Sequence, residues 1–333
     1  MSGKLKVAVI GTGHLGSIHA RLWKRIENVE LVGIYDVDTD KAKALSNELS
    51  CKLFSSIEEV ANNSNAITIA APTTLHFDIA RECVEHGKHC FIEKPITQTY
   101  YQAAELIELS KNKDVILQVG HVERFNPALL ALKSYKIEPM FIEAHRLSQF
   151  KPRATDVSVI HDLMIHDIDI MLWLVKSKVV SVDANGVQVL TNTPDIANAR
   201  IKFVNGCVAN VTASRISAHP MRKMRVFQNN AYISMDFGNQ EVDVYRILKD
   251  NESIDKQSPA TMLGTIEAGL KNKKIIYEKP AVPEINAILE EQRSFANAII
   301  SGEKVAVTAD EAAEALRIAE IINDQVERSI INS

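Results

Sequence analysis

A glycine-rich turn and one acidic residue give the first indication of chemistry. Residues 11–16 read Gly-Thr-Gly-His-Leu-Gly, directly after the apolar run Lys4–Ile10 and before a helical pattern. In such a turn the first glycine allows the bend, the second lets the backbone approach a pyrophosphate, and the third lets the helix pack against the strand. Asp36 follows about 20 residues later, where a carboxylate would accept hydrogen bonds from an adenosine ribose. The pattern predicts a dinucleotide site; the alternative is a plain strand–helix turn with Asp36 at a helix start.

The residues around Asp36 bear on which dinucleotide binds. A carboxylate at this point repels a 2′-phosphate, and the next residues, Val37 and Asp38, offer no arginine to receive one. The sequence therefore favours NAD over NADP. Lys41 and Lys43 keep NADP as the lesser alternative.

A lysine follows another predicted strand of the same sheet. Glu93-Lys94-Pro95 comes directly after His89–Ile92. Ligands bind at the carboxyl ends of parallel strands, so Lys94 should point toward the cofactor and could stabilise developing alkoxide charge. The alternative is an ordinary surface lysine. The same tripeptide recurs at 278–280, after an antiparallel-type strand, and we interpret that copy as chance.

A second cluster of polar residues interrupts an apolar helical segment predicted over 157–175. Asp162 and His166 are four residues apart and should share one helix face, and Asp169 follows His166 by three. A histidine beside a carboxylate is a usable general base near neutral pH. Two alternatives stand: a His–Asp pair satisfied within the core, and a metal site. No clean HExxH or two-His-one-carboxylate spacing is present, so we predict no metal.

The elements that must position these groups indicate an α/β protein of two domains. Up to about residue 120, short apolar strands alternate with helical patterns, which predicts a doubly wound parallel sheet, the Rossmann arrangement. Further along, paired strands between 199 and 248, with Asn205-Gly206 as a hairpin turn, predict an open, mostly antiparallel sheet. Two helices, 284–300 and 310–327, close the chain. We expect a dinucleotide-binding domain over 1–122 and a substrate-binding and oligomerisation domain over 123–333.

Composition excludes several classes of function. The chain has 333 residues and a formal charge of −4, which gives no general affinity for nucleic acid. Its apolar runs are too short to cross a bilayer, and its first residues form no apolar signal region, so we expect a cytoplasmic protein without membrane insertion. The four cysteines show no CxxC spacing and are expected to be reduced and buried.

Taken together, these motifs resemble the Gfo/Idh/MocA family of oxidoreductases. The resemblance rests on the glycine turn, Asp36, the segment 71–76 (Ala-Pro-Thr-Thr-Leu-His), Glu93-Lys94-Pro95 and the D-x-x-x-H-D-x-D of 162–169. It implies Lys94, His166 and Asp162 as the catalytic residues, with the reacting carbinol between Lys94 and His166. It also implies a homodimer or homotetramer joined through the open sheet. The cofactor-binding residues expected from the motifs are Gly11, Thr12, Gly13, His14, Leu15, Gly16, Asp36, Thr73, His76, Glu93 and Lys94.

Three further segments, 120–127, 143–147 and 151–157, resemble the family members that act on sugar nucleotides. This implies oxidation of the 3-hydroxyl of UDP-N-acetylglucosamine, with Arg124, Asn126 and Arg153 binding substrate beside Lys94, Asp162 and His166. Arginine forks suit a diphosphate, although ion pairing between domains explains each arginine equally well. The alternatives are an inositol, polyol or free-sugar dehydrogenase and, in another class, a regulator that senses a dinucleotide without catalysis.

Overall fold

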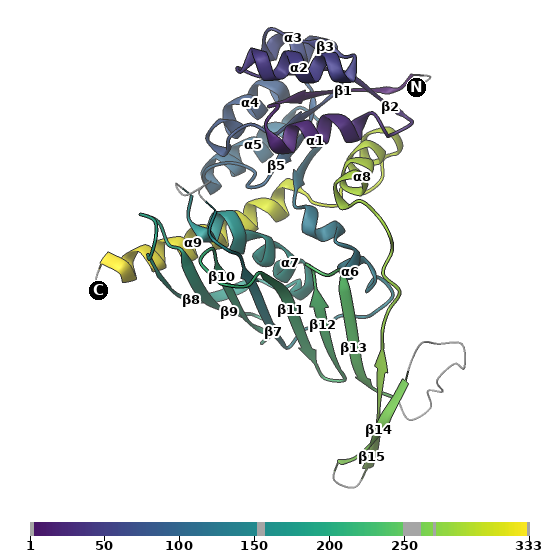
Figure 1. Ribbon diagram of the computed structural model, residues 1–333, viewed down its shortest axis with the longest axis vertical. Helices are drawn as coiled ribbons and strands as arrows, with labels where there is room; N and C mark the ends of the chain where they lie inside the picture. The colour runs from purple at the N-terminus through teal and green to yellow at the C-terminus, as the bar shows by residue number, and fades with distance from the viewer. Residues whose placement is uncertain (1–2, 152–156, 249–260, 269–270, 332–333) are drawn as a thin grey trace. The chain divides into compact units, whose positions relative to one another are not determined.

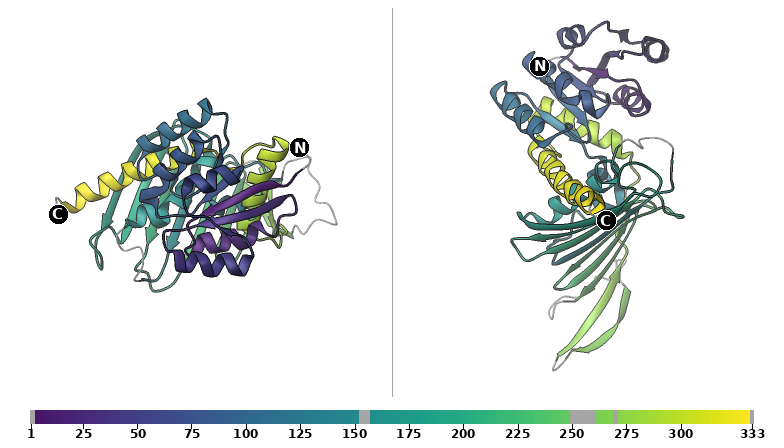
Figure 2. Two further views of the ribbon diagram at one scale, coloured as in Figure 1. Left: turned by 90° about the horizontal axis from the view of Figure 1, so that it is seen from above. Right: turned by 90° about the vertical axis from the view of Figure 1, so that its left-hand side faces the viewer.

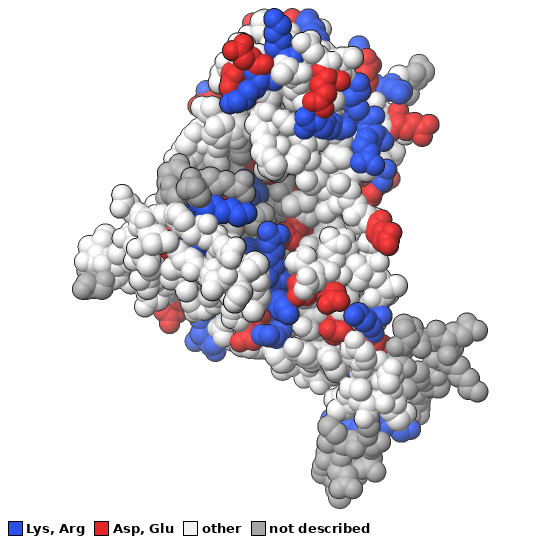
Figure 3. All heavy atoms as spheres, in the orientation of Figure 1, with Lys and Arg blue, Asp and Glu red and all other residues white. Residues whose placement is uncertain are grey.

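The computed structural model describes residues 3–151, 157–248, 261–268 and 271–331, and it separates into two compact units (Figure 1). The first comprises Met1–Val122 and Asn286–Arg317, and the second Glu123–Ile285 and Ile318–Ser333. On the face shown in Figure 3, acidic and basic side chains are intermingled, in keeping with the small net charge.

The first unit contains a six-stranded parallel sheet in the order β3-β2-β1-β4-β5-β6. The chain passes from β1 outward to β2 and β3, then returns to place β4 on the other side of β1. That reversal creates the point at which open α/β sheets bind ligands. The predicted strands and helices are confirmed, while β3 and α3 are short additions. The elements are β1 (Leu5–Ile10), α1 (His14–Trp23), β2 (Val29–Tyr35), α2 (Thr39–Leu49), β3 (Lys52–Leu53), α3 (Ile57–Asn63), β4 (Ala66–Ile69), α4 (Thr73–Glu85), β5 (His89–Glu93), α5 (Tyr100–Asn112) and β6 (Leu117–Gly120).

A helix from late in the chain completes the core of this unit. Phe295 of α8 (Ala287–Ser301) is fully buried with Trp23 of α1 and Phe91 of β5. The Phe91 and Phe295 rings meet edge to face, with centroids 5.9 Å apart. The first compact unit therefore contains α8 as well as the residues before 122, because the apolar face of α8 is buried against α1 and the parallel sheet.

The second unit contains a nine-stranded sheet in the order β14-β15-β13-β12-β11-β7-β10-β9-β8. All neighbours are antiparallel except β7 and β10, which confirms the expected open, mostly antiparallel sheet. The Asn205-Gly206 hairpin is present, and Gly206 has φ +86°. The strands are β7 (Phe141–Leu147), β8 (Val179–Val187), β9 (Ile196–Phe203), β10 (Val208–Ser214), β11 (Met221–Gln228), β12 (Ala231–Asp236), β13 (Glu241–Ile247), β14 (Thr261–Ala268) and β15 (Lys271–Glu278).

Strands β8 and β14 were not expected from the sequence, whereas β15 is the antiparallel strand expected before the second Glu-Lys-Pro tripeptide. β8 lies at the sheet edge, and its Asp, Asn and Gly residues are poor strand formers, so its pairing with β9 decides its conformation. The loop expected over 249–258 lies outside the described residues.

Helices cover one face of the large sheet, as the right-hand view of Figure 2 shows. α7 (Ile165–Val175) packs on β7 and β10, and the short α6 (Pro127–Leu130) packs on β12 and β13. Along β7 the side chains alternate: Ile142, Ala144 and Arg146 are buried, whereas Glu143 and His145 are partly exposed.

The last helix, α9 (Ala309–Ile331), begins with a capping box. The backbone N–H of Glu311 donates to Thr308 Oγ1 at 3.2 Å, and the N–H of Thr308 donates to Glu311 Oε2 at 3.1 Å. Among the residues that the structure describes, no helix combines the length and apolar character needed to span a bilayer.

Candidate active site

The glycine turn has the backbone geometry that a dinucleotide requires. Gly11 has φ +90°, and a Cβ there would lie 2.6 Å from the carbonyl oxygen of Ala70 at the end of β4. At Gly16 a Cβ would lie 1.9 Å from the Gly11 oxygen, so α1 approaches the turn only because no side chain intervenes. At Gly13 a Cβ would meet no described atom within 4 Å. The first and third glycines thus permit close packing, and the second faces open space.

The start of α1 presents its backbone to that space. Gly13 is the N-cap and supplies no side chain to cap the first turn, so the N–H groups of this turn can face an anion. Ser17 holds the turn from inside, because its hydroxyl donates to the Thr12 carbonyl at 2.8 Å. The predicted contacts His14 and Leu15 are exposed on the first turn of α1. These features fit a bound pyrophosphate.

Asp36 lies at the carboxyl end of β2 and is tied to the glycine turn. Its Oδ2 accepts hydrogen bonds from the Thr12 backbone N–H at 2.5 Å and from the Thr12 hydroxyl at 2.9 Å, and its Oδ1 accepts from the Asp38 N–H at 2.9 Å. The carboxylate is half-buried and stays within reach of a ligand. Lys41, which kept NADP open, is ion-paired with Asp38 at 2.7 Å. The structure thus places a carboxylate acceptor beside the glycine turn and pairs Lys41 with a neighbouring carboxylate.

Lys94 follows the carboxyl end of β5, as predicted for a group beside the cofactor. The carboxylate of Glu93, the last residue of β5, accepts from the Lys94 backbone N–H at 3.2 Å and lies 2.7 Å from His19 Nε2. Both Glu93 and Lys94 are partly exposed. The Lys94 backbone is thus held by the Glu93 carboxylate, while the Lys94 residue is partly exposed at the carboxyl end of the strand.

The first turn of α4 contains the two other predicted cofactor residues. Thr73 is the first residue of α4 and is half-exposed. His76 is only 1% exposed, and its ring nitrogens lie 2.9 Å from the carbonyl oxygens of Pro95 and Ala71. Burial lowers the pKa of His76. In the structure this histidine joins the loop before α4 to the segment after Lys94. A direct cofactor contact stays a prediction.

Asp162 and His166 belong to the second unit, where the helix is not regular. Residues Ile160–Met164 form a π-helical turn that leads into α7, whereas a continuous α-helix was expected. Such wide turns are rare and frequently occur at functional sites. Both side chains are half-buried, unlike the apolar neighbours Met164 and Ile165, which are fully buried. The motif thus presents its aspartate and histidine away from the core.

The buried acids of the same segment are paired with arginines. Asp167 accepts two hydrogen bonds from the Arg146 fork, at 2.8 and 3.0 Å, and Arg146 also donates to Glu123 at 2.8 Å. Burial raises the pKa of Asp167, and the attraction of Arg146 opposes that rise. Burial alone would lower the pKa of Arg146, but Asp167 and Glu123 raise it. The spacing of residues in the sequence did not predict that Glu123 would pair with Arg146.

Two residues predicted to bind substrate have structural partners within the second unit. Arg124 is 6% exposed and forms a bidentate pair with Asp169, with distances of 2.8 and 2.6 Å. Asn126 caps α6 and donates to Glu123 Oε2 at 3.0 Å. Arg124 therefore forms an ion pair, as the alternative interpretation held, but its partner lies in the same unit and not in the other domain. A substrate contact for either side chain stays a prediction.

The other expectations concern Arg153, metals and thiols. Arg153 lies outside the described residues. Within the described ranges, no group of His, Cys, Asp and Glu residues could hold a metal ion. The four cysteines are free thiols; Cys83, Cys90 and Cys207 are buried and Cys51 is partly exposed. A hydrogen bond with Cys83, together with burial, raises the pKa of the Cys90 thiol.

Comparison with known proteins places this site in a family. Residues 5–121 match the oxidoreductase family with an NAD-binding Rossmann fold, and residues 138–234 match the GFO/IDH/MocA C-terminal domain. The chain is 38% identical over 242 residues to UDP-N-acetylglucosamine 3-dehydrogenase of Acidithiobacillus ferrooxidans, covering 72% of this chain and 77% of the relative. It is 30% identical over 240 residues to scyllo-inositol 2-dehydrogenase (NAD(+)) of Bacillus subtilis strain 168, covering 66% and 70%.

A solved structure agrees with these relationships over almost the whole chain. The crystal structure of UDP-N-acetylglucosamine 3-dehydrogenase from A. ferrooxidans superposes with a TM-score of 0.86 at 32% identity, covering 98% of each chain. The chain has a Rossmann unit fit for a dinucleotide, the lysine after β5 and the aspartate–histidine pair in the helical segment between β7 and β8. It belongs to the Gfo/Idh/MocA family of NAD-binding oxidoreductases, dehydrogenases that act on CH–OH groups.

Proposed function

We propose that this protein is an NAD-dependent dehydrogenase that oxidises the 3-hydroxyl of UDP-N-acetylglucosamine to a ketone. The observation that carries the proposal is the 38% identity to the A. ferrooxidans enzyme of that name, against 30% or so for the inositol dehydrogenases. The presence of Lys94, Asp162 and His166 supports catalysis over a purely regulatory role, because a dinucleotide sensor needs no general base.

The chain's own residues would divide the reaction as follows. The N–H groups at the start of α1 would bind the pyrophosphate, and Asp36 the adenosine ribose. When bound, NAD supplies the hydride acceptor. Lys94 would donate a hydrogen bond to the substrate oxygen and stabilise its developing negative charge. His166 would take the hydroxyl proton, and Asp162 would orient the imidazole and support its positive charge.

The substrate assignment is tested by product analysis. Purified protein is incubated with NAD and UDP-N-acetylglucosamine beside a panel of inositols and free hexoses, with a carbonyl trap present because the equilibrium can disfavour the ketone. Mass spectrometry should show a trapped 3-keto sugar nucleotide. Turnover of an inositol or hexose without this product would move the assignment to the polyol class, which the B. subtilis relative makes the second candidate.

Cofactor preference follows from the contacts of Asp36. The protein should bind NADH more tightly than NADPH. Asp36→Ala should weaken NADH binding by about 10- to 100-fold, the effect of losing a hydrogen bond to a charged group. NADPH binding should fall less, because the same change removes a repulsive charge. Fluorescence titration with both cofactors measures this.

The control separates ribose binding from the integrity of the turn. Thr12→Val removes the hydroxyl bond to Asp36 but keeps the backbone N–H bond, so NADH binding should change little. An equal loss in Thr12→Val and Asp36→Ala would assign the effect to the turn. Tighter binding of NADPH than NADH by the unmutated protein would contradict the proposed preference.

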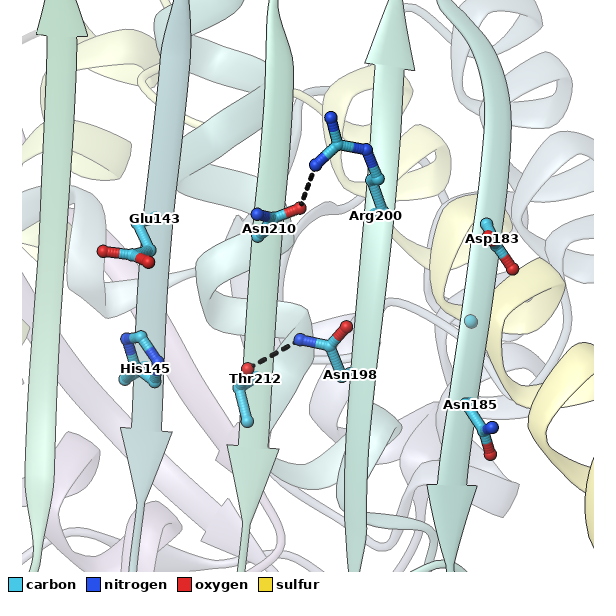
Figure 4. A pocket seen from close by; sticks show the side chains of 9 residues that line it. Glu143, His145, Asp183, Asn185, Asn198, Arg200, Asn210 and Thr212 are labelled. Atoms are coloured by element: carbon cyan, nitrogen blue, oxygen red, sulfur yellow. Dashed lines mark hydrogen bonds between the residues drawn. The ribbon is translucent and has the colours of Figure 1, made fainter.

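The uncovered face of the large sheet supports an oligomer. A row of aromatic rings crosses five strands with centroids 5.0–5.7 Å apart between neighbours: Phe141, Phe227, Tyr232, Tyr245 and Tyr277. Beside it lies the polar hollow of Figure 4, where Arg200 donates to Asn210 and Asn198 donates to Thr212. Polar groups around an aromatic centre are typical of protein interfaces.

We expect a homodimer or homotetramer that buries this face. Light scattering at micromolar concentration should give a multiple of 37.0 kDa. Tyr232→Glu places a charge in the middle of the aromatic row and should shift the protein toward monomer. Tyr101→Glu, at an exposed tyrosine of α5 outside the sheet, should not. A 37.0 kDa particle from the unmutated protein would contradict the assembly.

A further inference from the structure

A buried histidine connects α8 to the catalytic edge of the parallel sheet. His19 of α1 is fully buried, and its Nε2 lies 2.7 Å from Glu93 Oε1. On the other side, the amide nitrogen of Gln292, a fully buried residue of α8, lies 3.0 Å from His19 Nδ1 and 3.0 Å from the His19 carbonyl oxygen. All three residues belong to the first unit.

These contacts determine which ring nitrogen carries the proton. The His19 carbonyl oxygen can only accept, so the Gln292 group facing it must be the amide NH2. The same NH2 faces Nδ1, which must then accept. The proton of the neutral ring is therefore on Nε2, from which it donates to the Glu93 carboxylate. Gln292 thus orients His19, and His19 directs its donor at Glu93.

Glu93 has little freedom once this hydrogen bond forms. Its other oxygen accepts from the Lys94 backbone N–H at 3.2 Å. Its carboxylate also lies against Gly120, its register partner in β6, where a Cβ would come within 3.1 Å of both oxygens. The Glu93 carboxylate is held between α1 and β6. It also accepts a hydrogen bond from the backbone nitrogen of Lys94, the residue proposed to bind the substrate oxygen.

We propose that His19 and Gln292 are positioning residues that act through Glu93 to fix the backbone of Lys94. The proposal rests on the proposed role of Lys94 in catalysis. It gives α8 a function besides packing: the helix supplies the amide that sets the His19 proton. Misplacing a reacting group by about 1 Å can cost about 100-fold in rate, so a network far from the chemistry can have a large effect.

Two substitutions of His19 distinguish positioning from space filling. Glutamine reaches about as far as Nε2 and keeps a donor for Glu93, whereas asparagine reaches only as far as Nδ1. We expect His19→Asn to lower kcat by about 100-fold, with KM and NADH affinity changed by less than about 3-fold. His19→Gln should recover most of the loss, and Gln292→Met should give an intermediate loss.

The matched control is Gln118→Met. Gln118 is a second fully buried glutamine contacting α8, through the Glu291 carbonyl at 2.9 Å. Gln118→Met should lower the melting temperature by about as much as Gln292→Met does, while its kcat stays near that of the unmutated enzyme. A comparable drop in kcat for Gln118→Met would assign the effect to general loosening of α8.

A measurement that needs no substrate separates this proposal from the proposed function. In protein labelled with 15N-lysine, with the Lys94 signal assigned by Lys94→Arg, the Lys94 amide resonance should move in His19→Asn, move less in His19→Gln and stay in place in Gln118→Met. An unmoved resonance in His19→Asn, or equal kcat losses in the Asn and Gln variants, would overturn the proposal. Absence of UDP-N-acetylglucosamine oxidation by the unmutated protein would refute the substrate assignment, and the amide shifts would still decide the positioning.

Discussion

Replacing His166 by Asn or Lys94 by Met is expected to lower kcat by about 100- to 10,000-fold, the range typical of losing a positioned acid or base. Asparagine keeps a polar amide that reaches as far as Nδ1 but cannot take the hydroxyl proton. Methionine keeps the length of lysine without the charge that stabilises the developing alkoxide. NADH affinity should change little, because the expected pyrophosphate contacts come from the turn at 11–16 and not from these side chains. Single-turnover kinetics with a trapped ketone product measure the loss.

The chain contains its own control for the lysine. Lys279 belongs to the second Glu-Lys-Pro tripeptide, at the end of the antiparallel strand β15, and its ammonium group lies 3.5 Å from Glu241 on an exposed surface. Lys279→Met should leave kcat unchanged, since the tripeptide acts only where a parallel strand delivers it to a ligand crevice. Full activity in His166→Asn would discard the assignment of His166 as the base.

The nucleotide-binding part of the protein could be predicted from sequence because its signals are local. The turn at 11–16 needs glycine for reasons visible within a few residues: a positive φ at Gly11 and a helix packed against the Gly11 carbonyl at Gly16. The short apolar strands around it are buried on both faces and read as continuous runs. The position of Asp36 then follows from the length of one strand–helix–strand unit.

The features that sequence reasoning missed depend on contacts between distant segments. The expected boundary at 122 assigns α8 to the second domain, yet its Phe295 is buried with Trp23 and Phe91. His19 lies three residues after the last glycine of the turn, and its importance is apparent only when Glu93 and Gln292 are seen beside it. No local pattern encodes a partner about 270 residues away.

The sequence also could not distinguish arginines that bind a substrate from arginines that form buried ion pairs. A cluster of arginines between two domains suits a diphosphate, and sequence alone leaves ion pairing equally open. The structure shows Arg124 and Arg146 in bidentate pairs with the buried acids of α7, Asp169 and Asp167. The D-x-x-x-H-D-x-D motif therefore combines two roles: its first aspartate and its histidine are accessible, and its last two aspartates are structural.

Removing one member of that buried network is expected to be severely destabilising. Arg146→Met leaves Asp167 and Glu123 buried without their shared cation, and breaking a buried pair in this way costs about 3–5 kcal/mol in the free energy of unfolding. Urea denaturation with linear extrapolation measures the change. Arg21→Met is the matched control: Arg21 makes the same two-pronged contact with Glu48, but both side chains are about half exposed, so the loss should be within about 1 kcal/mol.

The pH dependence of this loss identifies its cause. Burial already raises the pKa of Asp167 while Arg146 opposes the rise, so without the arginine the folded-state pKa of this carboxyl should rise further. A carboxyl whose pKa is higher in the folded than in the unfolded state costs stability once the unfolded chain ionises, so the deficit of Arg146→Met should grow as the pH rises from about 5 to about 8. Adding Asp167→Leu and Glu123→Gln to Arg146→Met should restore much of the stability and abolish this pH dependence, because the buried charges are then gone. A deficit that is the same at both pH values would show that Arg146 stabilises the unit through the packing of its side chain and not through its charge.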